Sequence, residues 1–450
     1  MMIISTLRVP LIASLIFLSF KNLIEAKSIN FPENKENYNN KSHTIPKRVS
    51  IPVHYVSGSH YEVGYSVGRT YGQMIKDFLK IYSPLHDYLK LLEKPEGRII
   101  YEESLKATEK YFPQYVTELQ GVADGAKVSF EELFLMALDD TLPMNINKEH
   151  IDRGPVGCSS LLVNQPNGQF LGHTEDALAS TEDNYYIIAA HIIPNKYESG
   201  GVFKAREEKF EALAYAGHLP GYASGYNYHG VVFSINTIFV TKPLRGRIPR
   251  EFITRALLSS RANMTEIIEI LTNEGVGTAD AFHVNLAFLN VPKESRIFHS
   301  IEVSPNSNKF QSEVFTADFS FGTNSFHANR FLHLKYSESD DELSYGSSVK
   351  REERYKQLTE NNTVSSLNDV LNVLGNEDDG KSSIFRNIPD ELVKTIHLGV
   401  FDLNKKVWMM WTKNPIHNPP LVQLSLTFND LLSLPIRKDI ESNNINDTTN

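Results

Sequence analysis

The stretch DRGPVGCSSLLVNQPNGQFLGHTEDA, residues 152–177, decides the fold expected for this chain. Two runs, SSLLVN and QFLGHT, flank the segment QPNG (165–168), a pattern typical of two strands joined by a tight turn. Before the first run, the segment GPVG (154–157) forms an irregular and permissive connection. Cys158 therefore stands at the start of a predicted strand, behind a glycine that lets the backbone bend sharply.

That position suits a reaction of the thiol with its own backbone. The sulfur of Cys158 can attack the carbonyl carbon of Gly157, so that the acyl group moves from nitrogen to sulfur and water then breaks the thioester. The new chain begins with Cys158, and its α-amino group, with a pKa of about 7.7–8.0, can serve as the base for the adjacent thiol. Gly-Cys-Ser is nevertheless a weak motif by itself.

The cysteine count alone favours a plainer interpretation. Secreted proteins usually use cysteines in disulfide pairs, whereas this chain contains a single cysteine and can form no internal disulfide. A lone cysteine is most often a small buried apolar residue. The residues around Cys158 must therefore decide between a structural and a functional thiol.

Composition limits the possible partners. The chain has 450 residues, of which 41% are hydrophobic and 22% charged, as in ordinary globular proteins. Its formal net charge is -9, and no run of Lys and Arg is interleaved with aromatic residues. Binding to a nucleic-acid backbone needs a basic face. No nucleic-acid partner is expected.

The N-terminus predicts a secretory route. Residues 1–26 carry one early positive charge at Arg8, an apolar run and the small residue Ala26, the pattern of a signal peptide. The apolar run is shorter than the roughly 20 residues of a membrane span, so no stable span is expected. An uncleaved signal anchor is the alternative. We therefore expect the protein to be secreted or lysosomal.

Further features agree with that route. Residues 27–50 and 436–450 are polar and Asn-rich, which is typical of a flexible leader and a polar tail. Four Asn-x-Ser/Thr sequons are candidate glycosylation sites, although each is a common match. They are Asn40, Asn263, Asn361 and Asn446.

Between these ends, residues 51–435 predict one continuous domain of the α+β class. Residues 61–137 repeat apolar side chains at spacings of three and four, which indicates helices. Beyond Cys158 the pattern turns to strands, among them YYIIAAHII, GVVFSINTIFV and TIHLGVFDL. Strands in pairs with helices before and between them favour antiparallel sheets covered by helices. YYIIAAHII lacks alternation and is expected to be buried on both faces.

Several stretches resemble the penicillin acyltransferase-like (peptidase C45) family of N-terminal nucleophile hydrolases. Within that family the likeness is strongest to members that cleave N-β-alanyl amines such as β-alanyl-dopamine and carcinine. Beside residues 157–177, the stretches that carry the resemblance are GSHYEVGYSVGRTYG (58–72), FPQYVTELQGVADGA (112–126), YAGHLPGY (215–222) and YNYHGVVFSINTI (226–238).

The resemblance implies a four-layer αββα sandwich with a helical N-terminal segment. It also implies self-cleavage into an N-terminal subunit, residues 51–157, and a C-terminal subunit, residues 158–435, which stay together as a heterodimer. By the same resemblance the catalytic residues are Cys158 as nucleophile, Asp176 beside the new N-terminus, and Asn236 as donor to the oxyanion. The plainer interpretations are that Asp176 caps a turn and that Asn236 satisfies buried backbone groups.

One departure from the family concerns acyl transfer. The fungal acyltransferase carries a late Ser-Arg pair that does not align here, where the nearest residues are Val393 and Lys394. This favours simple hydrolysis. Arg351, on a stretch with Glu352 and Glu353, is expected on a charged exposed face.

Polar residues near the motif have other possible roles. His173, Glu175 and Asp176 could suggest a metal, but no spaced His or Cys completes a ligand set, so neither metal nor cofactor is expected. Asp139, Asp140 or Glu175 could pair with the ammonium of a β-alanyl group, because a buried cation needs a counter-charge. For the aspartates, a solvated helix end is the equally good alternative.

The sequence thus predicts a hydrolase of linear amides that acts on a small-molecule N-acyl amine through a Cys158 thioester. Two alternatives stay open. The chain could instead transfer the acyl group or act on another acyl amide, or it could be an inactive secreted binding protein that kept the fold.

Overall fold

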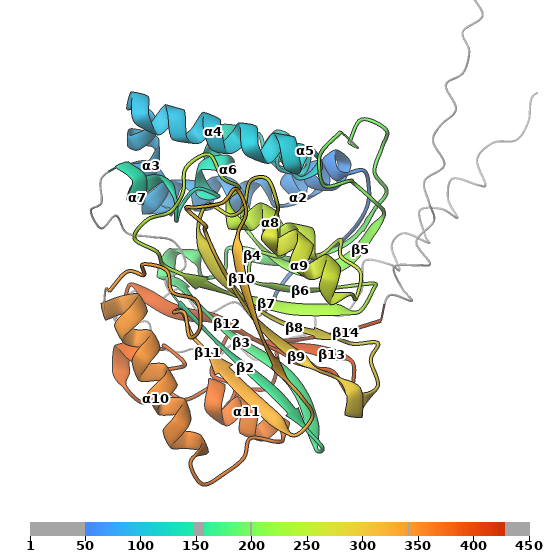
Figure 1. Ribbon diagram of the computed structural model, residues 1–450, viewed down its shortest axis with the longest axis vertical. Helices are drawn as coiled ribbons and strands as arrows, with labels where there is room; N and C mark the ends of the chain where they lie inside the picture. The colour runs from blue at the N-terminus through green and yellow to red at the C-terminus, as the bar shows by residue number, and fades with distance from the viewer. Residues whose placement is uncertain (1–49, 147–156, 199, 341, 428–450) are drawn as a thin grey trace, which may run out of the picture. The chain divides into compact units, whose positions relative to one another are not determined.

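The computed structural model describes residues 50–146, 157–198, 200–340 and 342–427. Contacts divide the chain into a unit of residues 1–46 and a compact unit of residues 47–450, which holds every described residue. The predicted signal peptide, leader and tail lie outside the described residues, except for Ser50. The described residues form two β-sheets with helices on the outer face of each (Figure 1).

The first sheet has eight strands. Nearly all of its neighbouring strands are antiparallel, the exception being β1, which runs parallel to β4. In spatial order the strands are β1 (Val53–Gly58), β4 (Tyr185–Ile192), β5 (Glu208–Tyr215), β6 (Ser224–Asn227), β7 (Val231–Ile238), β8 (Ala281–Phe288), β9 (Phe298–Ser304) and β10 (Glu313–Phe319).

The second sheet has six antiparallel strands and begins at the cysteine. Its first two strands in sequence, β2 and β3, are the pair predicted around the QPNG turn, and that prediction is confirmed. In spatial order the strands are β11 (Thr323–His327), β2 (Gly157–Gln165), β3 (Gly168–Leu178), β12 (Val393–Asp402), β13 (Val407–Trp411) and β14 (Val422–Ser425).

The helices confirm the apolar periodicity of residues 61–137. The capping box of Ser59 and Glu62 begins α2, and Pro113 begins α5, where its missing N–H is not needed. The helices are α2 (His60–Ile81), α3 (Ser83–Leu92), α4 (Pro95–Tyr111), α5 (Pro113–Ala126), α6 (Phe130–Met136), α7 (Leu142–Ile146), α8 (Arg250–Leu257), α9 (Met264–Thr272), α10 (Ser347–Thr359) and α11 (Leu367–Leu374).

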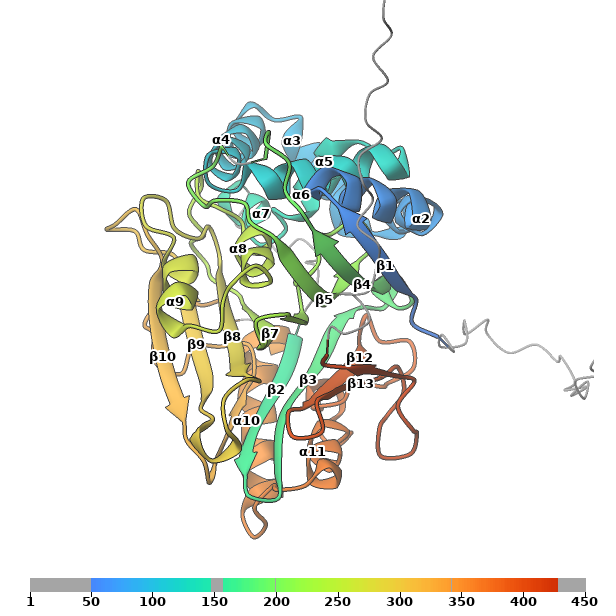
Figure 2. The same cartoon turned by 90° about the vertical axis from the view of Figure 1, so that its right-hand side faces the viewer.

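Three apolar cores separate four layers, as the family resemblance implies. In β4, Tyr186 and Ile188 pack in the core that also contains α2–α8, whereas Tyr185 and Ile187 pack between the sheets. In β2, Leu162 belongs to that middle core, whereas the residues beside it pack with α11. Figure 2 shows α2–α6 beyond the first sheet and α10 and α11 beyond the second. The predicted α+β sandwich is therefore confirmed.

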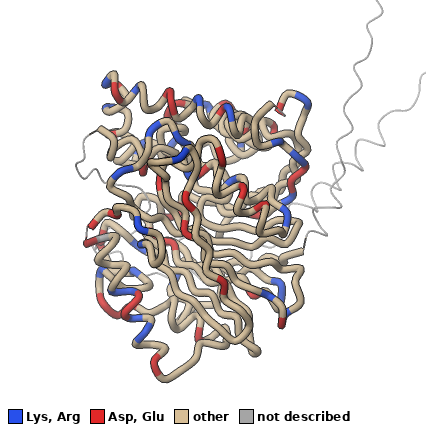
Figure 3. Tube along the Cα trace, in the orientation of Figure 1, with Lys and Arg blue, Asp and Glu red and all other residues tan. Residues whose placement is uncertain are grey.

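Charge lies mainly outside these layers. Figure 3 shows Lys, Arg, Asp and Glu gathered on the outer helices and loops, while the strands are mainly uncharged. Among the described residues, no helix is long and apolar enough to cross a membrane. The charged residues that do lie between the layers gather in a few clusters, and one of these surrounds Cys158.

Candidate functional site

Cys158 is the second residue of β2 and is buried, with 2% of its surface exposed. Its main-chain N–H donates to Oδ1 of Asn329 at 2.8 Å. Its carbonyl oxygen accepts a hydrogen bond from the guanidinium of Arg351. That guanidinium also donates to Asn329 Oδ1 at 2.8 Å. Both backbone polar groups of the cysteine are therefore held by side chains.

Gly157 lies among polar side chains. A Cβ atom added there would lie 3.3 Å from Asp176, 3.4 Å from Asn329 and 3.5 Å from Arg351. The distances to Asp176 and Asn329 are tight and the distance to Arg351 is an ordinary contact, so a larger residue would crowd the first two groups. The bond between Gly157 and Cys158 is thus surrounded by an acid, an amide and a cation.

Asp176 is the cross-strand partner of Gly157 and is fully buried. Its carboxylate accepts a hydrogen bond from Thr395 and lies 3.4 Å from Arg386. The register of β12 against β3 shifts between Thr395 and His397. Such irregularities often re-aim side chains next to active sites. Asp176 therefore has a fixed orientation and a cationic neighbour.

The thiol is held in its neutral form. Burial raises the pKa of Cys158 well above its ordinary value, and the charges of Glu175 and Asp176 raise it further. Hydrogen bonds from the Thr237 backbone and the Asn329 side chain act in the opposite direction but are smaller. A base is therefore needed before the sulfur can act as a nucleophile.

His173 and Glu175 lie on β3, facing β2. Glu175 is the cross-strand partner of Cys158, and its carboxylate lies 2.8 Å from Nε2 of His173. The other ring nitrogen of His173 shares a 2.8 Å hydrogen bond with Ser160. Burial, and then the charge of Glu175, raises the pKa of the nearby Tyr215 hydroxyl. The carboxylate of Glu175 therefore interacts with both the His173 ring and the Tyr215 hydroxyl.

Asn236 lies on β7 of the first sheet, whereas Cys158 lies on β2 of the second. Its Oδ1 accepts hydrogen bonds from Ser160 and Asn285, both at 2.8 Å, and its Nδ2 donates to the His327 carbonyl at 3.5 Å. The next residue, Thr237, supplies the backbone hydrogen bond to the thiol. The oxyanion role expected for Asn236 stays a prediction, since the short bonds of its side chain are made by Oδ1.

Asp139 and Asp140 lie in a separate buried cluster. They are 5% and 8% exposed, so the alternative of a solvated helix end is wrong. Tyr222 donates to Asp139 at 3.3 Å, and Arg250 donates to Asp140 at 3.4 Å. Asp280 accepts from the Arg250 backbone, and burial followed by the charge of Asp140 raises the pKa of Asp280 to about 7. Arg250 is therefore shared among several acids.

Asn329 and Arg351 are the site residues that the sequence analysis missed. The expectation of an exposed Arg351 is wrong, because the side chain is fully buried on α10. Burial, and then the neighbouring Arg386, lowers its pKa to about 10, so it stays cationic near neutral pH. Because Glu352 and Glu353 follow it directly, the sequence around Arg351 is typical of an exposed face although this arginine points inward. Neither residue adjoins the motif in sequence: Arg351 reaches it from α10 and Asn329 from the segment after β11.

The thiol also completes a possible ligand set. One ligand atom from each of Cys158, His173 and Glu175 lies within 4.8 Å of the others, and all three residues are buried. Sequence spacing did not reveal this group, because antiparallel pairing of β2 and β3 brings the residues together across 15 to 17 positions.

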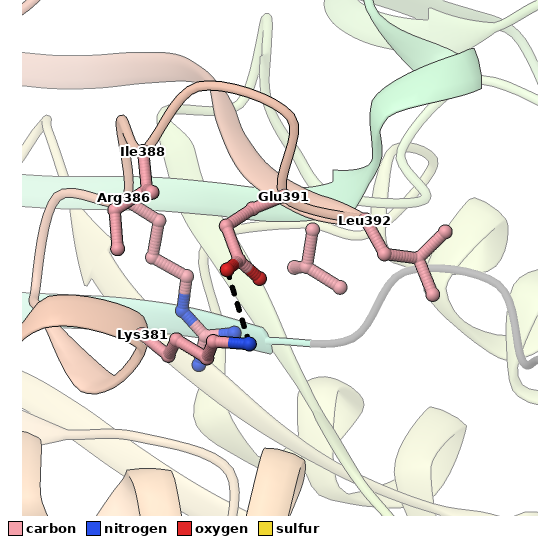
Figure 4. Close-up of a pocket in the computed structure, with 6 residues that line it drawn as sticks. Lys381, Arg386, Ile388, Glu391 and Leu392 are labelled. Carbon is pink, nitrogen blue, oxygen red and sulfur yellow. Dashed lines mark ion pairs between the residues drawn. The ribbon is translucent and has the colours of Figure 1, made fainter.

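A pocket of about 230 Å³ adjoins the site through Arg386 (Figure 4). Lys381 and Glu391 form a 3.0 Å ion pair on its wall. Arg386 faces the pocket and also pairs with Asp176. The pocket is lined by Lys381, Arg386, Ile388, Glu391, Leu392 and Val393.

Two of the four sequons lie on the described surface. Asn263 is exposed and caps α9, and Asn361 is exposed after α10. Asn40 and Asn446 lie outside the described residues. Glycosylation at any of them stays a prediction.

The sequence profile of the family "Acyl-coenzyme A:6-aminopenicillanic acid acyl-transferase" matches residues 163–417, more than half of the chain. The chain belongs to this family. Over 389 residues it is 41% identical to the beta-alanyl-dopamine/carcinine hydrolase of Drosophila melanogaster, covering 85% of this chain and 98% of that protein. The predicted resemblance and the predicted enzyme class, an amidohydrolase, are confirmed.

Solved structures with partial likeness include the conjugated bile acid hydrolase of Clostridium perfringens. A mutant of that protein has a TM-score of 0.36 at 14% identity, covering 60% of this chain and 92% of that chain. The penicillin V acylase of Agrobacterium tumefaciens has a TM-score of 0.36 at 12% identity, covering 58% and 84%.

Proposed function

We propose that this protein is a secreted, self-processing cysteine amidohydrolase that releases β-alanine from an N-β-alanyl amine such as β-alanyl-dopamine or carcinine. The observation that carries the proposal is the enclosure of the Gly157–Cys158 bond by Asp176, Asn329 and Arg351. A bond held only for structural reasons has no need of three buried polar side chains around it. The activity named for the 41% identical relative supplies the substrate class.

Self-processing begins with the thiol. The sulfur attacks the Gly157 carbonyl carbon and the thiol proton passes to the departing nitrogen of Cys158, which acts as the base in this step. The peptide C–N bond breaks and that nitrogen becomes an amine. Asn329 already accepts a hydrogen bond from that nitrogen, so it can keep the leaving amine in place. Water then hydrolyses the thioester, which gives a carboxylate on Gly157 and restores the thiol.

The freed amine then supplies the missing base. With a pKa of about 7.7–8.0 in the absence of perturbation, it can take the thiol proton near neutral pH. The sulfur attacks the substrate carbonyl, and the amine returns the proton to the departing amine product. Water completes the cycle by hydrolysing the acyl thioester. Asp176 is placed to orient the amine, since it lies opposite Gly157 in the sheet.

Glu175 is the better of the proposed partners for the β-alanyl ammonium. In a β-alanyl group the nitrogen lies roughly 3–4 Å from the carbonyl carbon, from standard bond lengths. The carboxylate of Glu175 lies within 4.8 Å of the Cys158 ligand atom, which matches that reach. Asp139 and Asp140 lie in the separate cluster around Arg250, which already pairs with Asp140, whereas Glu175 is the cross-strand partner of Cys158.

The test compares two acyl groups of equal size on one amine. We expect the purified protein to hydrolyse β-alanyl-dopamine at least about tenfold faster, in kcat/KM, than butyryl-dopamine, in which a methyl group replaces the ammonium. Glu175→Gln should remove most of this preference, whereas Asp140→Asn should keep it. A processed protein that releases no β-alanine would overturn the substrate class, and added amines would reveal acyl transfer by product mass.

Secretion belongs to the same proposal and has its own test. A reporter fused behind residues 1–40 should appear in the medium of secretory cells. Retention of the reporter in the cytosol would remove this part of the proposal and leave the chemistry untouched.

A further inference from the structure

The two ring nitrogens of His173 have different partners, Ser160 and Glu175. Ser160 has a single proton, which it donates to Oδ1 of Asn236, so it must accept the hydrogen bond that it shares with His173. Nδ1 of His173 therefore carries a proton and donates. The remaining nitrogen, Nε2, faces Glu175 at 2.8 Å.

This leaves two electron-pair donors facing one another. Neutral Nε2 and an ionised carboxylate oxygen are both acceptors, so a proton or another cation must lie between them. The same arrangement occurs around metal-binding histidines, whose second ring nitrogen donates to a neighbouring group that fixes the ring. Ser160, itself held by Asn236, has that role here.

The sulfur of Cys158 is a third possible metal ligand beside His173 and Glu175. In a tetrahedral site with metal–ligand distances of about 2.0–2.3 Å, the ligand atoms lie roughly 3.3–3.6 Å apart. The observed separations range from 2.8 Å for His173 and Glu175 to at most 4.8 Å within the group. Shifts below about 1 Å bring the three atoms to tetrahedral distances, and thiolate with imidazole favours zinc-like ions over magnesium or calcium.

Other buried histidine–carboxylate pairs lack this combination. His60 pairs with Glu118, but Arg255 already donates to that carboxylate. His218 pairs with Glu251, which also accepts the backbone N–H of Leu219. Among the described residues, only the Cys158 group brings three such ligand atoms together.

We propose that Cys158, His173 and Glu175 form a binding site for one zinc-like divalent cation, and that a bound cation blocks the thiol reversibly. Binding itself needs only the three side chains, whereas inhibition rests on the proposed function. In the processed chain the α-amino group of Cys158 would close a five-membered N,S chelate and fill a fourth position. The cation would then compete with the substrate for both sulfur and Glu175.

The experiment is a titration of the purified full chain with Co²⁺ alone, followed by displacement with Zn²⁺. We expect a 1:1 complex with a thiolate-to-cobalt charge-transfer band and tetrahedral visible bands, both abolished by Zn²⁺. Cys158→Ala should lose the charge-transfer band. His173→Asn and Glu175→Gln should each weaken Co²⁺ affinity at least about tenfold, as should Ser160→Ala through the orientation of His173.

The matched control is His191→Asn, which breaks a histidine–glutamate pair of the same 2.8 Å length that lies apart from any cysteine. It should leave the Co²⁺ spectrum and affinity unchanged. Absence of a charge-transfer band in folded wild-type protein, or equal affinity in the wild-type, His173→Asn and Glu175→Gln proteins, would overturn the proposal.

Intact mass of the same samples separates the two proposals. If the chain is never cut but shows the thiolate-to-cobalt charge-transfer band, the metal site is supported and the proposed function fails. A cut and active enzyme without the band would support the function while the metal site fails.

Discussion

At the residue scale, Arg351 is the most informative side chain outside the motif. Its guanidinium donates to the Cys158 carbonyl and also holds Asn329. A buried guanidinium costs several kcal/mol in solvation unless hydrogen bonds replace water. Its remaining donors reach Ser347, Ser348 and Ser159. Such a network keeps a cation beside the bond that we propose is cut.

We expect Arg351→Met to slow self-processing by about a hundredfold or more, because it removes the cation beside the bond and the hydrogen bond to the Cys158 carbonyl. The measurement is the uncut fraction with time after synthesis, by mass. Arg354→Met on the same helix is the control, since Arg354 pairs with acids outside the site, such as Asp379 at 2.7 Å. If both variants are cut as fast as wild type, Arg351 is structural. Melting curves would identify a variant that fails to fold.

A second prediction at this scale concerns pH. The pKa of Asp280 is about 7 in the fold, chiefly through burial, and 3.8 without it. The folded state therefore binds more protons than the unfolded state between these values, and stability falls as pH rises from about 4 to 7. Asp280→Asn should not lose stability in this way. The variant's free energy of unfolding should therefore exceed that of the wild type by an amount that grows with pH, to at most about 4 kcal/mol by pH 8.

Denaturant unfolding at pH 4, 6 and 8 measures that advantage. The exposed Asp340→Asn should show no such dependence. An Asp280→Asn advantage that is constant with pH, or that grows toward acid, would contradict the assigned titration.

The sequence was enough for some of the site residues and not for others. Gly157 and Cys158 could be named from the local pattern before the predicted strand, whereas Asp176 and Asn236 were named only through the family resemblance. Asn329 and Arg351 could not be named, since they reach the cysteine from 171 and 193 residues away. No local pattern encodes that separation, and α10 carries so much charge that its inward-facing arginine resembles its outward-facing neighbours.

At the element scale, local periodicity predicted most helices and the long strands, and it failed for short or uneven ones. The two runs of β2 and β3 could be recognised around the QPNG turn, and β4 could be recognised by its apolar run. The short strands β6 and β14, with four residues each, carry too little pattern to be recognised. Beyond the hairpin of β2 and β3, strand order could not be predicted, because partners such as β1 and β4 are more than 120 residues apart.

The contact between α2 and α5 offers a test at this scale. A Cβ added at Gly68 would lie 2.1 Å from the Val122 carbonyl oxygen, so the two helices would have to separate. We expect Gly68→Ala to lower the free energy of unfolding by about 1–3 kcal/mol, despite the better helix propensity of alanine. Denaturant unfolding measures the effect.

Gly72→Ala is the matched control on the same helix. The nearest atom to its Cβ is the Ala126 Cα at 3.2 Å, a contact that a small shift relieves. We expect a change within about 1 kcal/mol. Equal effects of the two substitutions would contradict the close approach of the helices.

At the scale of the whole molecule, the proposed cut separates β1 and α2–α7 from the remaining elements. The cut pieces would still share the ladder between β1 and β4 and the helical core. They would also share a buried ion network in which Arg255 lies between Glu118 of one piece and Glu208 of the other, at 2.8 and 2.7 Å. We therefore expect the two pieces to elute together in native buffer and to separate only in denaturant.

The central claim is that Cys158 cuts the bond before it. The most direct test is the intact mass, under denaturing conditions, of the wild-type protein beside Cys158→Ala. We predict two wild-type fragments, the second beginning with Cys158, with masses that sum to the uncut chain plus one water, and a single uncut chain for the variant. A single uncut chain from both proteins, or the same two fragments from both, would contradict the account.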